Sequence, residues 1–260
     1  MLKISIITVC YNSEKYIRSA IESVKNQTYS NIEYIVIDGG SSDDTIDIVK
    51  EYKSSVSLFI SEPDNGIYDA MNKGVALATG DVVGVLNSDD FFSSKDIISK
   101  IVNTFSNSNI DALYGDIGFV NPYNENVIVR YYSSKYFRRW MFHLATSPPH
   151  PSFYVKKTKY VELGNYDSNY KIGADLDLMM RFMYKSNINY TYLEESIVTM
   201  RLGGVSTDLN NLILLNRECL LACKNNAIYS NWTFMLVKYL LKFINQKLLY
   251  FLKFQYLIKK

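Results

Sequence analysis

Cysteine, histidine and proline are scarce in this chain of 260 residues, which contains three, two and five of them respectively. Cys10, Cys219 and Cys223 form no CxxC pair and have no histidine pair nearby. The sequence therefore indicates neither a zinc site nor a disulfide framework. We expect reduced thiols and a cytoplasmic location.

Long apolar runs are missing as well. The longest stretch without Asp, Glu, Lys or Arg, Trp140–Val155, contains three prolines and is not expected to span a membrane. The first residues lead directly into a strand-length apolar segment, and we expect no signal peptide. No G-x-G-x-x-G motif follows a predicted strand, which disfavours a dehydrogenase. A net charge of only +2 gives no reason to expect nucleic-acid binding.

The composition itself is that of an ordinary globular protein, with 48% hydrophobic and 21% charged residues. The length suffices for one large core. Charge is unevenly distributed, because seven lysines and no acidic residue lie between Lys224 and Lys260. The preceding part is acidic on balance, and the basic end predicts a charged partner surface.

Apolar β-branched runs alternate with helical periodicity through the first half of the chain. Strands are predicted at Ile4–Val9, Ile32–Asp38, Leu58–Ser61 and Val82–Leu86, and helices at Tyr16–Asn26, Thr45–Tyr52, Ile67–Ala78 and Lys95–Phe105. Beyond residue 110 we expect strands at 112–120, 126–132 and 188–202 and helices at 175–185, 207–225 and 232–258. The alternation predicts an α/β fold with a mainly parallel central sheet and a helical C-terminal extension.

Each of the first four predicted strands ends in a polar or acidic cluster. The clusters are Thr8–Asn12 with Glu14, Asp38–Thr45, Glu62–Gly66 and Asn87–Asp90. Taken singly, each could be a turn or could cap the next helix. Because ligands bind at the carboxyl ends of the strands in such sheets, four coincident clusters favour a shared binding site. Carboxylates without nearby His or Cys suit Mg²⁺ or Mn²⁺, so we expect a nucleotide-diphosphate site.

Five motifs in order give the sequence a resemblance to a known family. They are Ile6–Asn12, Asp38–Thr45, Asp64–Gly74, Asn87–Asp90 and Ala174–Leu178. On these motifs the sequence resembles family 2 glycosyltransferases with the GT-A fold, a Rossmann-like fold of nucleotide-diphospho-sugar transferases. The third motif resembles a bacterial subgroup that assembles O-antigen, capsule and other exopolysaccharides.

The resemblance implies a role for each matching position. The donor nucleotide sugar would be bound by Thr8, Tyr11, Glu14, Asp38, Gly39, Asp69, Lys73, Asn87, Ser88 and Asp89. Asp90 would hold Mn²⁺ or Mg²⁺ as part of the family's DxD motif, although Ser88 replaces the first Asp. Asp175 would be the catalytic base, although Ala174 stands where many relatives have Glu. Asp177 is the alternative base, because residues i and i+2 of a helix face apart and only one can point at the acceptor.

Three further residues are weaker candidates for the acceptor or diphosphate site. His150 lies in a proline-rich segment similar to one near the acceptor side in the subgroup, and Arg201 precedes a glycine-rich loop from which it could reach the diphosphate. Asp116, in the sequence Tyr-Gly-Asp, could be a strand-end contact with the donor sugar. Each of the three could instead be structural, and we interpret His143 as structural.

The predicted helix at the end of the chain places Lys238, Lys242, Lys253 and Lys260 within a narrow arc. Apolar residues cover much of the remainder, a pattern typical of a helix on an anionic membrane. Packing on the domain or on a second copy in a homodimer is the alternative. We therefore divide the chain into a GT-A domain at 1–225 and a basic amphipathic helix at 226–260. Within the domain we expect a nucleotide-binding half at 1–110 and an acceptor half at 111–225.

Taken as a whole, the resemblance implies a metal-dependent inverting glycosyltransferase, peripheral on the inner face of the cytoplasmic membrane. It would transfer a hexose from UDP-Glc or UDP-Gal to a saccharide on polyprenyl diphosphate, in O-antigen or lipopolysaccharide assembly. Two alternatives stay open. One is a nucleotidyltransferase, for which a basic signature loop is missing from the early part of the chain. The other is an inactive partner subunit that binds the sugar nucleotide or lipid.

Overall fold

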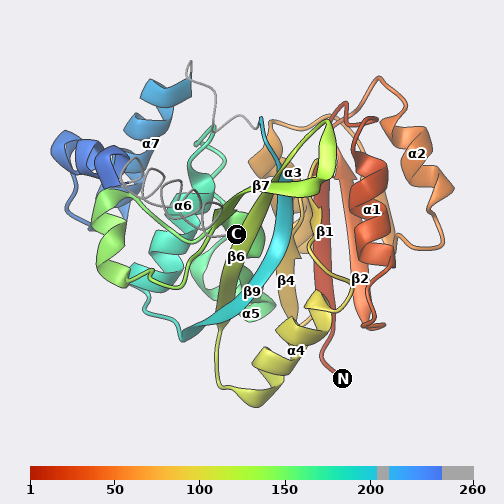
Figure 1. Cartoon of the computed structure of the whole chain (residues 1–260), viewed down its shortest axis with the longest axis horizontal. Helices are drawn as coiled ribbons and strands as arrows, with labels where there is room; N and C mark the ends of the chain where they lie inside the picture. The colour runs from red at the N-terminus through yellow and green to blue at the C-terminus, as the bar shows by residue number, and fades with distance from the viewer. Residues whose placement is uncertain (204–210, 242–260) are drawn as a thin grey trace, which may run out of the picture.

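The computed structural model describes residues 1–203 and 211–241 and is built on one twisted β-sheet (Figure 1). The strands lie in the order β3-β2-β1-β4-β8-β6-β9-β5, and β7 pairs with β6. Their bounds are β1 Ile4–Cys10, β2 Ile32–Asp38, β3 Leu58–Ser61, β4 Val82–Val85, β5 Phe91–Phe92, β6 Ala112–Asn121, β7 Asn124–Tyr132, β8 Tyr154–Lys156 and β9 Tyr190–Arg201. β1 to β4 run parallel, as do β6 and β9, whereas β5, β7 and β8 join antiparallel.

Helices cover both faces of the sheet, because its strands are apolar on both sides. One face packs against α1 (Ile17–Lys25), α2 (Thr45–Glu51) and α4 (Ile97–Asn107). The other packs against α3 (Ile67–Leu77), α5 (Lys157–Leu163), α6 (Ala174–Met179) and α7 (Leu212–Asn225). The turns of α6 continue as a π-helical segment, Met180–Lys185. The result is a three-layer α/β/α arrangement.

The close approach of α3 to β1 depends on Gly74. A Cβ at this position would lie 2.4 Å from the Cγ2 of Ile7, which is fully buried in β1. Only glycine lets the helix backbone lie this near the strand without displacing the isoleucine. The packing fixes the polar first turns of α3 against the carboxyl ends of β1 and β2.

The sequence predicted the parallel sheet and the main helices, and the structure confirms the α/β fold. It adds β5, β8, α5 and two short 3-10 helices, Arg139–Leu144 and His150–Ser152, which the sequence analysis did not predict. Each is too short to show a helical or strand period. Of the two helices predicted last, α7 begins at Leu212, and residues 232–241 are helical. Residues 207–210 and 242–258 of those predictions lie outside the described residues.

Lys238 occupies a different side of the last helix from the one predicted. It lies on the same side as Met235, three residues earlier, which belongs to the buried core, and only 7% of it is exposed. Trp232, Leu236 and Leu240 are instead exposed. Within 232–241 the outward face is therefore apolar.

Cys10, Cys219 and Cys223 are buried, and none of them takes part in a disulfide. Among the described residues, no helix combines the length and the apolar character needed to cross a membrane.

Candidate active site

Hydrogen bonds join the loops that follow β1, β2 and β4. After β1 the chain turns at Asn12, whose φ of 47° is left-handed, a conformation that asparagine tolerates well. Its backbone N–H donates to Ser41 Oγ at 2.8 Å, and its Oδ1 accepts the Ser42 N–H at 2.9 Å. Ser13 and Ser88 share a hydrogen bond of 2.9 Å between their hydroxyls. Three of the four predicted polar clusters are thus brought together at one edge of the sheet.

Asp38 is fully buried and shapes the loop after β2. Its carboxylate accepts the N–H groups of Gly40 and Ser41, at 3.1 and 3.0 Å, and the Ser61 hydroxyl at 2.7 Å. Gly40 has a φ of 83°, which permits the tight turn around the carboxylate. Asp38 therefore fixes the conformation of the loop that contains Gly39 and Gly40.

Gly39 lies against the carboxylate of Asp64, which follows β3. A Cβ on Gly39 would be 2.6 Å from Asp64 Oδ2. The fourth cluster thus also contacts this loop, through Asp64. This residue begins the third motif, and no role was predicted for it. Asp64 adds a second carboxylate beside the one that Asp38 supplies.

The three residues expected to line the base pocket lie in different surroundings. Thr8 is fully buried, and its hydroxyl accepts a 3.0 Å hydrogen bond from Tyr34. Tyr11 is 64% exposed at the surface of the joined loops. Glu14 is exposed and accepts the Asp44 N–H at 3.1 Å. Of these three residues, Tyr11 has the side chain with a large solvent-exposed surface.

Asp69 and Lys73 lie one turn apart on α3. The ammonium group of Lys73 is 3.0 Å from Glu62 and 3.7 Å from Asp69. Asp69 also accepts the Asn65 N–H at 3.0 Å. The two residues therefore hold the segment after β3 against the start of α3.

Asn87 and Asp90 form a buried turn after β4. The Asn87 amide donates to Asp90 Oδ2 at 3.1 Å, and Asp90 is fully buried. Among the described residues, neither the Oδ1 of Asp90 nor the Oδ1 of Asn87 has a hydrogen-bond partner. Burial, and next the charge of Asp89, raises the pKa of the Asp90 carboxyl well above its usual range. Two buried oxygens without donors are what a hard cation would satisfy.

The residues at this turn fit a divalent metal held largely by its substrate. Within residues 1–203 and 211–241, no three His, Cys, Asp or Glu side chains form an enclosing cluster. A cation here would take oxygens of Asp90 and Asn87 and complete its coordination with phosphate and water, as Mg²⁺ commonly does. The loops around it are rich in carboxylates, which a diphosphate would not approach without a cation.

Arg201, at the end of β9, is buried rather than placed on a loop surface, with 5% exposed. Its guanidinium donates to the backbone carbonyl of Asp89, to Ser19 Oγ at 2.9 Å and to Glu125 at 2.7 Å. It also lies over the ring of Phe91, 5.0 Å from its centroid. Arg201 therefore holds the turn that contains Asp90 from behind.

Asp175 is the second residue of α6 and is half-buried. Its Oδ1 accepts the Leu176 N–H at 2.7 Å. Burial raises the pKa of the Asp175 carboxyl to about 6, with a smaller contribution from the charge of Glu218. A carboxylate whose pKa lies near neutrality is suited to accept a proton.

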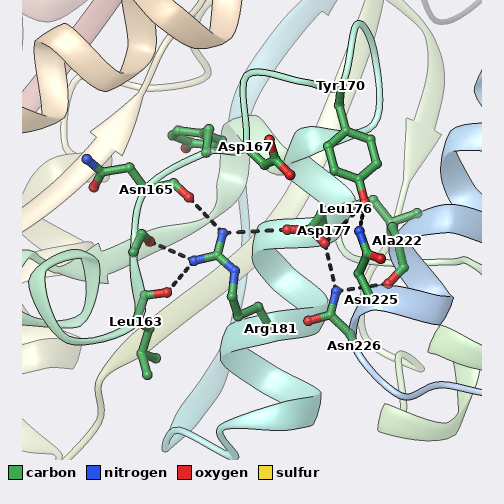
Figure 2. A network of polar contacts seen from close by, with 12 residues as sticks. Leu163, Asn165, Asp167, Tyr170, Leu176, Asp177, Arg181, Ala222, Asn225 and Asn226 are labelled. Atoms are coloured by element: carbon green, nitrogen blue, oxygen red, sulfur yellow. Dashed lines mark hydrogen bonds and ion pairs between the residues drawn. The ribbon is translucent and has the colours of Figure 1, made fainter.

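Asp177 belongs to a closed network of polar contacts (Figure 2). One carboxylate oxygen accepts the Asn226 amide at 2.8 Å, and the other lies 3.5 Å from Arg181. Arg181 in turn donates to the carbonyls of Gly164 and Asn165, at 2.8 and 2.7 Å. Asp177 thus ties α6 to the loop after α5 and to the end of α7, and both of its carboxylate oxygens are engaged by protein groups.

Asp116 and His150 also have protein partners. Asp116 accepts hydrogen bonds from the hydroxyls of Tyr131 and Tyr192, at 2.7 and 2.9 Å, and joins β6 to β7 and β9. His150 is buried, shares a 2.7 Å hydrogen bond with Tyr166, and has a pKa lowered by burial to about 4. It is therefore neutral near pH 7. Each of these contacts favours a supporting role.

His143, which we interpreted as structural, has a partner for each ring nitrogen. They are the Tyr229 carbonyl at 2.7 Å and the Tyr184 hydroxyl at 3.1 Å.

Two charged residues act on Asp175 without having been predicted to do so: Glu218 was not identified from the sequence, and Lys238 was predicted on the membrane-facing side of the last helix. Glu218 of α7 is 8% exposed and Lys238 is 7% exposed, and the charges of both act on the Asp175 carboxyl. The available signal was a charged residue on an apolar helical stripe, since Glu218 lies beside Cys219 and one turn before Ala222. A charge in such a position needs a buried partner.

A cavity of about 260 Å³ opens between the first turn of α3 and the segment before α6. Its lining includes Gly66, Tyr68, Asp69, Asn169 and Lys171. Tyr68 links this cavity to the segment that carries Asp175, because its hydroxyl donates to the Ile172 carbonyl. Polar side chains line the cavity on both sides, Asp69 on that of α3 and Asn169 and Lys171 on that of the segment before α6.

Comparison with known proteins gives concordant results. Residues 5–160 match the profile described as Glycosyl transferase family 2. An uncharacterized glycosyltransferase of Mycobacterium tuberculosis is 32% identical over 194 residues, which cover 68% of each chain.

Two solved structures share the fold. A 1–349 fragment of S. aureus TarS in complex with UDP-GlcNAc has a TM-score of 0.67 and 18% identity, over 86% of this chain and 67% of that one. The chain spans only 37% of a longer TarS chain. The mannosyltransferase PcManGT from Pyrobaculum calidifontis, in complex with GDP-Man and Mn²⁺, has a TM-score of 0.62 and 16% identity, over 87% of this chain and 64% of that one. Both likenesses agree with the predicted GT-A fold.

Proposed function

Because the chain belongs to glycosyl transferase family 2, and is therefore a nucleotide-sugar-dependent glycosyltransferase, we propose that it transfers a hexose from a UDP-sugar to a saccharide acceptor carried on a polyprenyl diphosphate. UDP-Glc and UDP-Gal are the proposed donors, and O-antigen or related polysaccharide assembly is the proposed process. Family membership sets aside the nucleotidyltransferase alternative. An inactive binding subunit is the alternative that the experiment below excludes or establishes.

The observation that carries the proposal is a pair of buried oxygens, on Asn87 and Asp90, that have no hydrogen-bond partner in the part of the chain that the structure describes. Mn²⁺ or Mg²⁺ bound there would neutralise charge on the leaving nucleoside diphosphate. The solved complexes of TarS with UDP-GlcNAc and of PcManGT with GDP-Man and Mn²⁺ support a nucleotide-sugar donor and a divalent cation.

The chain's own residues would divide the remaining work. Tyr11 offers an exposed ring against which the base can stack, while Asp38 and Gly39 shape the loop that receives the nucleotide. Asp89 would hydrogen-bond the ribose. Asp175 would take the proton of the acceptor hydroxyl as that oxygen attacks the anomeric carbon, opposite the departing diphosphate. Such a displacement inverts the anomeric configuration, so an α-linked donor gives a β-linkage.

The apolar outward face of residues 232–241 supports a peripheral location on the inner face of the cytoplasmic membrane. Trp232, Leu236 and Leu240 are each more than half exposed there. Lys242, Lys247 and Lys253 follow in the sequence and would be attracted to anionic lipid headgroups. A membrane position would bring the site to a lipid-linked acceptor.

Nucleoside-diphosphate release from a panel of UDP-, GDP- and dTDP-sugars tests the proposal. The assay runs with Mn²⁺, with Mg²⁺ and with EDTA, each with and without a synthetic diphosphate-lipid-linked GlcNAc or GalNAc. We expect metal-dependent release from a UDP-hexose that the lipid-linked acceptor enhances. Donor binding without release under every condition, for protein shown to be folded, would establish the inactive-subunit alternative.

Two substitutions test the assigned residues. Asp175→Ala should lower kcat by about 100-fold or more, as expected for a missing general base, and leave donor affinity intact. Asp90→Ala should remove metal-dependent donor binding, measured by calorimetry. Full activity in either variant would contradict that residue's role.

A further inference from the structure

Glu218 holds the segment that leads into α6. Its carboxylate accepts three consecutive backbone N–H groups, from Lys171 at 2.9 Å, Ile172 at 2.9 Å and Gly173 at 2.8 Å. Such an arrangement satisfies donors that would otherwise be buried at the start of a helix. The segment lies 45 to 47 positions away in the sequence, so the contact is a tertiary one.

The fit between α7 and this segment is close. A Cβ on Gly173 would lie 3.2 Å from the Cβ of Glu218, so the backbone approaches the glutamate more closely than most side chains would allow. From the opposite side, Tyr68 of α3 donates a hydrogen bond to the Ile172 carbonyl. Residues 171–173 are therefore clamped through their N–H groups and through a carbonyl group, two residues before Asp175.

We propose that Glu218 is a positioning residue for the reaction, which fixes Asp175 in its catalytic orientation and maintains its strength as a base. The inference rests on the proposed role of Asp175. Glu218 touches neither donor nor acceptor in this scheme and acts through the backbone and through its charge.

The charges around Asp175 support the proposed effect of Glu218 on its strength as a base. Among the described residues, the charges of Glu218 of α7 and Lys238 of helix 232–241 act on the Asp175 carboxyl, and Asp175 in turn acts on the hydroxyls of Tyr68 and Tyr166. The negative charge of Glu218 raises the pKa of Asp175, and the ammonium group of Lys238 lowers it. The two charges therefore shift the pKa of the base in opposite directions.

Glu218→Gln is the direct test, because glutamine keeps the size and one acceptor oxygen but loses the charge. We expect kcat for the active UDP-hexose to fall about 10- to 100-fold, the loss typical of a misplaced catalytic group, with donor KM changed less than about twofold. In a plot of kcat against pH, the acid limb, over which kcat rises to its plateau, should move to lower pH. Lys238→Met should move the same limb to higher pH. Glu162→Gln, an exposed glutamate of α5 paired with Lys159, is the matched control and should change neither.

Two further measurements separate positioning from general stability. Hydrogen exchange should show that the amides of residues 171–173 lose protection in Glu218→Gln, while those of β1 and β2 keep theirs. In an Asp175→Asn background, Glu218→Gln should cost no further activity, since a residue that acts through Asp175 has nothing left to position.

The outcomes separate the role of Glu218 from the proposed role of Asp175. An unchanged pH midpoint in both Glu218→Gln and Lys238→Met, or a full additional loss in the Asp175→Asn background, would overturn the role of Glu218 and leave the proposed function standing. Wild-type kcat in Asp175→Asn alone would instead overturn the assignment of the base. If Glu218→Gln does not fold, Lys238→Met still tests the charge balance through the direction of the pH shift.

Discussion

At the scale of single residues, the surroundings of Asp175 predict how activity depends on pH. A general base must be deprotonated to accept the acceptor's proton, and burial raises the pKa of this carboxyl to about 6. The kcat should therefore rise with pH, reach half its plateau near pH 6 and level off above pH 7. The measurement is transfer rate at saturating donor and metal from pH 4.5 to 8. A half-maximum near pH 4, the range of an ordinary aspartate, would contradict this account.

The burial of Asp90 predicts that its carboxylate lowers the stability of the metal-free protein, although the same group would bind the metal. Its buried carboxylate has an oxygen with no donor among the described residues, and burying such a charge is costly. In EDTA at pH 7.5, Asp90→Asn should therefore raise Tm, by roughly 2–4 °C for each kcal/mol of relieved desolvation. The same variant should lose the increase in Tm that Mn²⁺ gives to the native protein. Scanning calorimetry measures both, and a lower Tm in EDTA would show that the carboxylate is stabilised in the absence of metal.

The sequence analysis identified the right segments more reliably than the orientation of individual side chains. Thr8 and Asp38 occupy motif positions of donor-binding residues, yet both are fully buried and bonded to Tyr34 and Ser61 respectively. Those partners lie more than 20 positions away, so no local pattern could reveal them. Lys238 illustrates the same limit, because a helical wheel cannot show that its ammonium group packs against Cys219 Sγ of α7, at 3.9 Å.

At the scale of secondary-structure elements, the carboxyl end of β9 supports the turn after β4. Arg201 supplies this support through hydrogen bonds to the Asp89 carbonyl, Ser19 and Glu125. Arg201→Met should lower the free energy of unfolding by about 2 kcal/mol, because it removes the hydrogen bonds of a buried guanidinium to the partly buried Asp89 carbonyl and Ser19 hydroxyl. It should also weaken Mn²⁺-dependent donor binding, since the turn that contains Asp90 loses its anchor.

Urea unfolding and calorimetry with UDP-hexose test this expectation. Arg18→Met is the matched control, because Arg18 pairs with Glu51 and Tyr52 at the surface and should change neither quantity measurably. Lower stability with unchanged donor affinity in Arg201→Met would show that the turn holds its shape without this arginine.

The parallel strands and the helices of the first half were predictable because each is a local apolar pattern bounded by turn residues. β8 and β5, of three and two residues, were not. Their places in the sheet depend on pairing with β4, β6 and β9, which lie far away in the sequence. For the same reason the hydrogen bonds between Glu218 of α7 and residues 171–173 could not be predicted, although both helices were predicted.

At the scale of the whole molecule, the outward face of helix 232–241 predicts that the enzyme binds membranes, where the proposed lipid-linked acceptor would lie. Trp232, Leu236 and Leu240 are 52%, 69% and 58% exposed, and a basic sequence follows. We expect the full chain to float with vesicles that contain phosphatidylglycerol, less so with neutral phosphatidylcholine, and less at high salt.

Leu236→Glu and Leu240→Glu should each weaken vesicle binding by at least about 10-fold, because a leucine contributes about 1.5–3 kcal/mol when it is buried. Val161→Glu is the control, since Val161 is 78% exposed on α5, outside this face. Sedimentation of the same variants decides what covers the leucines. If the native chain is a dimer that the leucine substitutions dissociate, while vesicle binding stays unchanged, the face is a subunit interface and the membrane proposal fails.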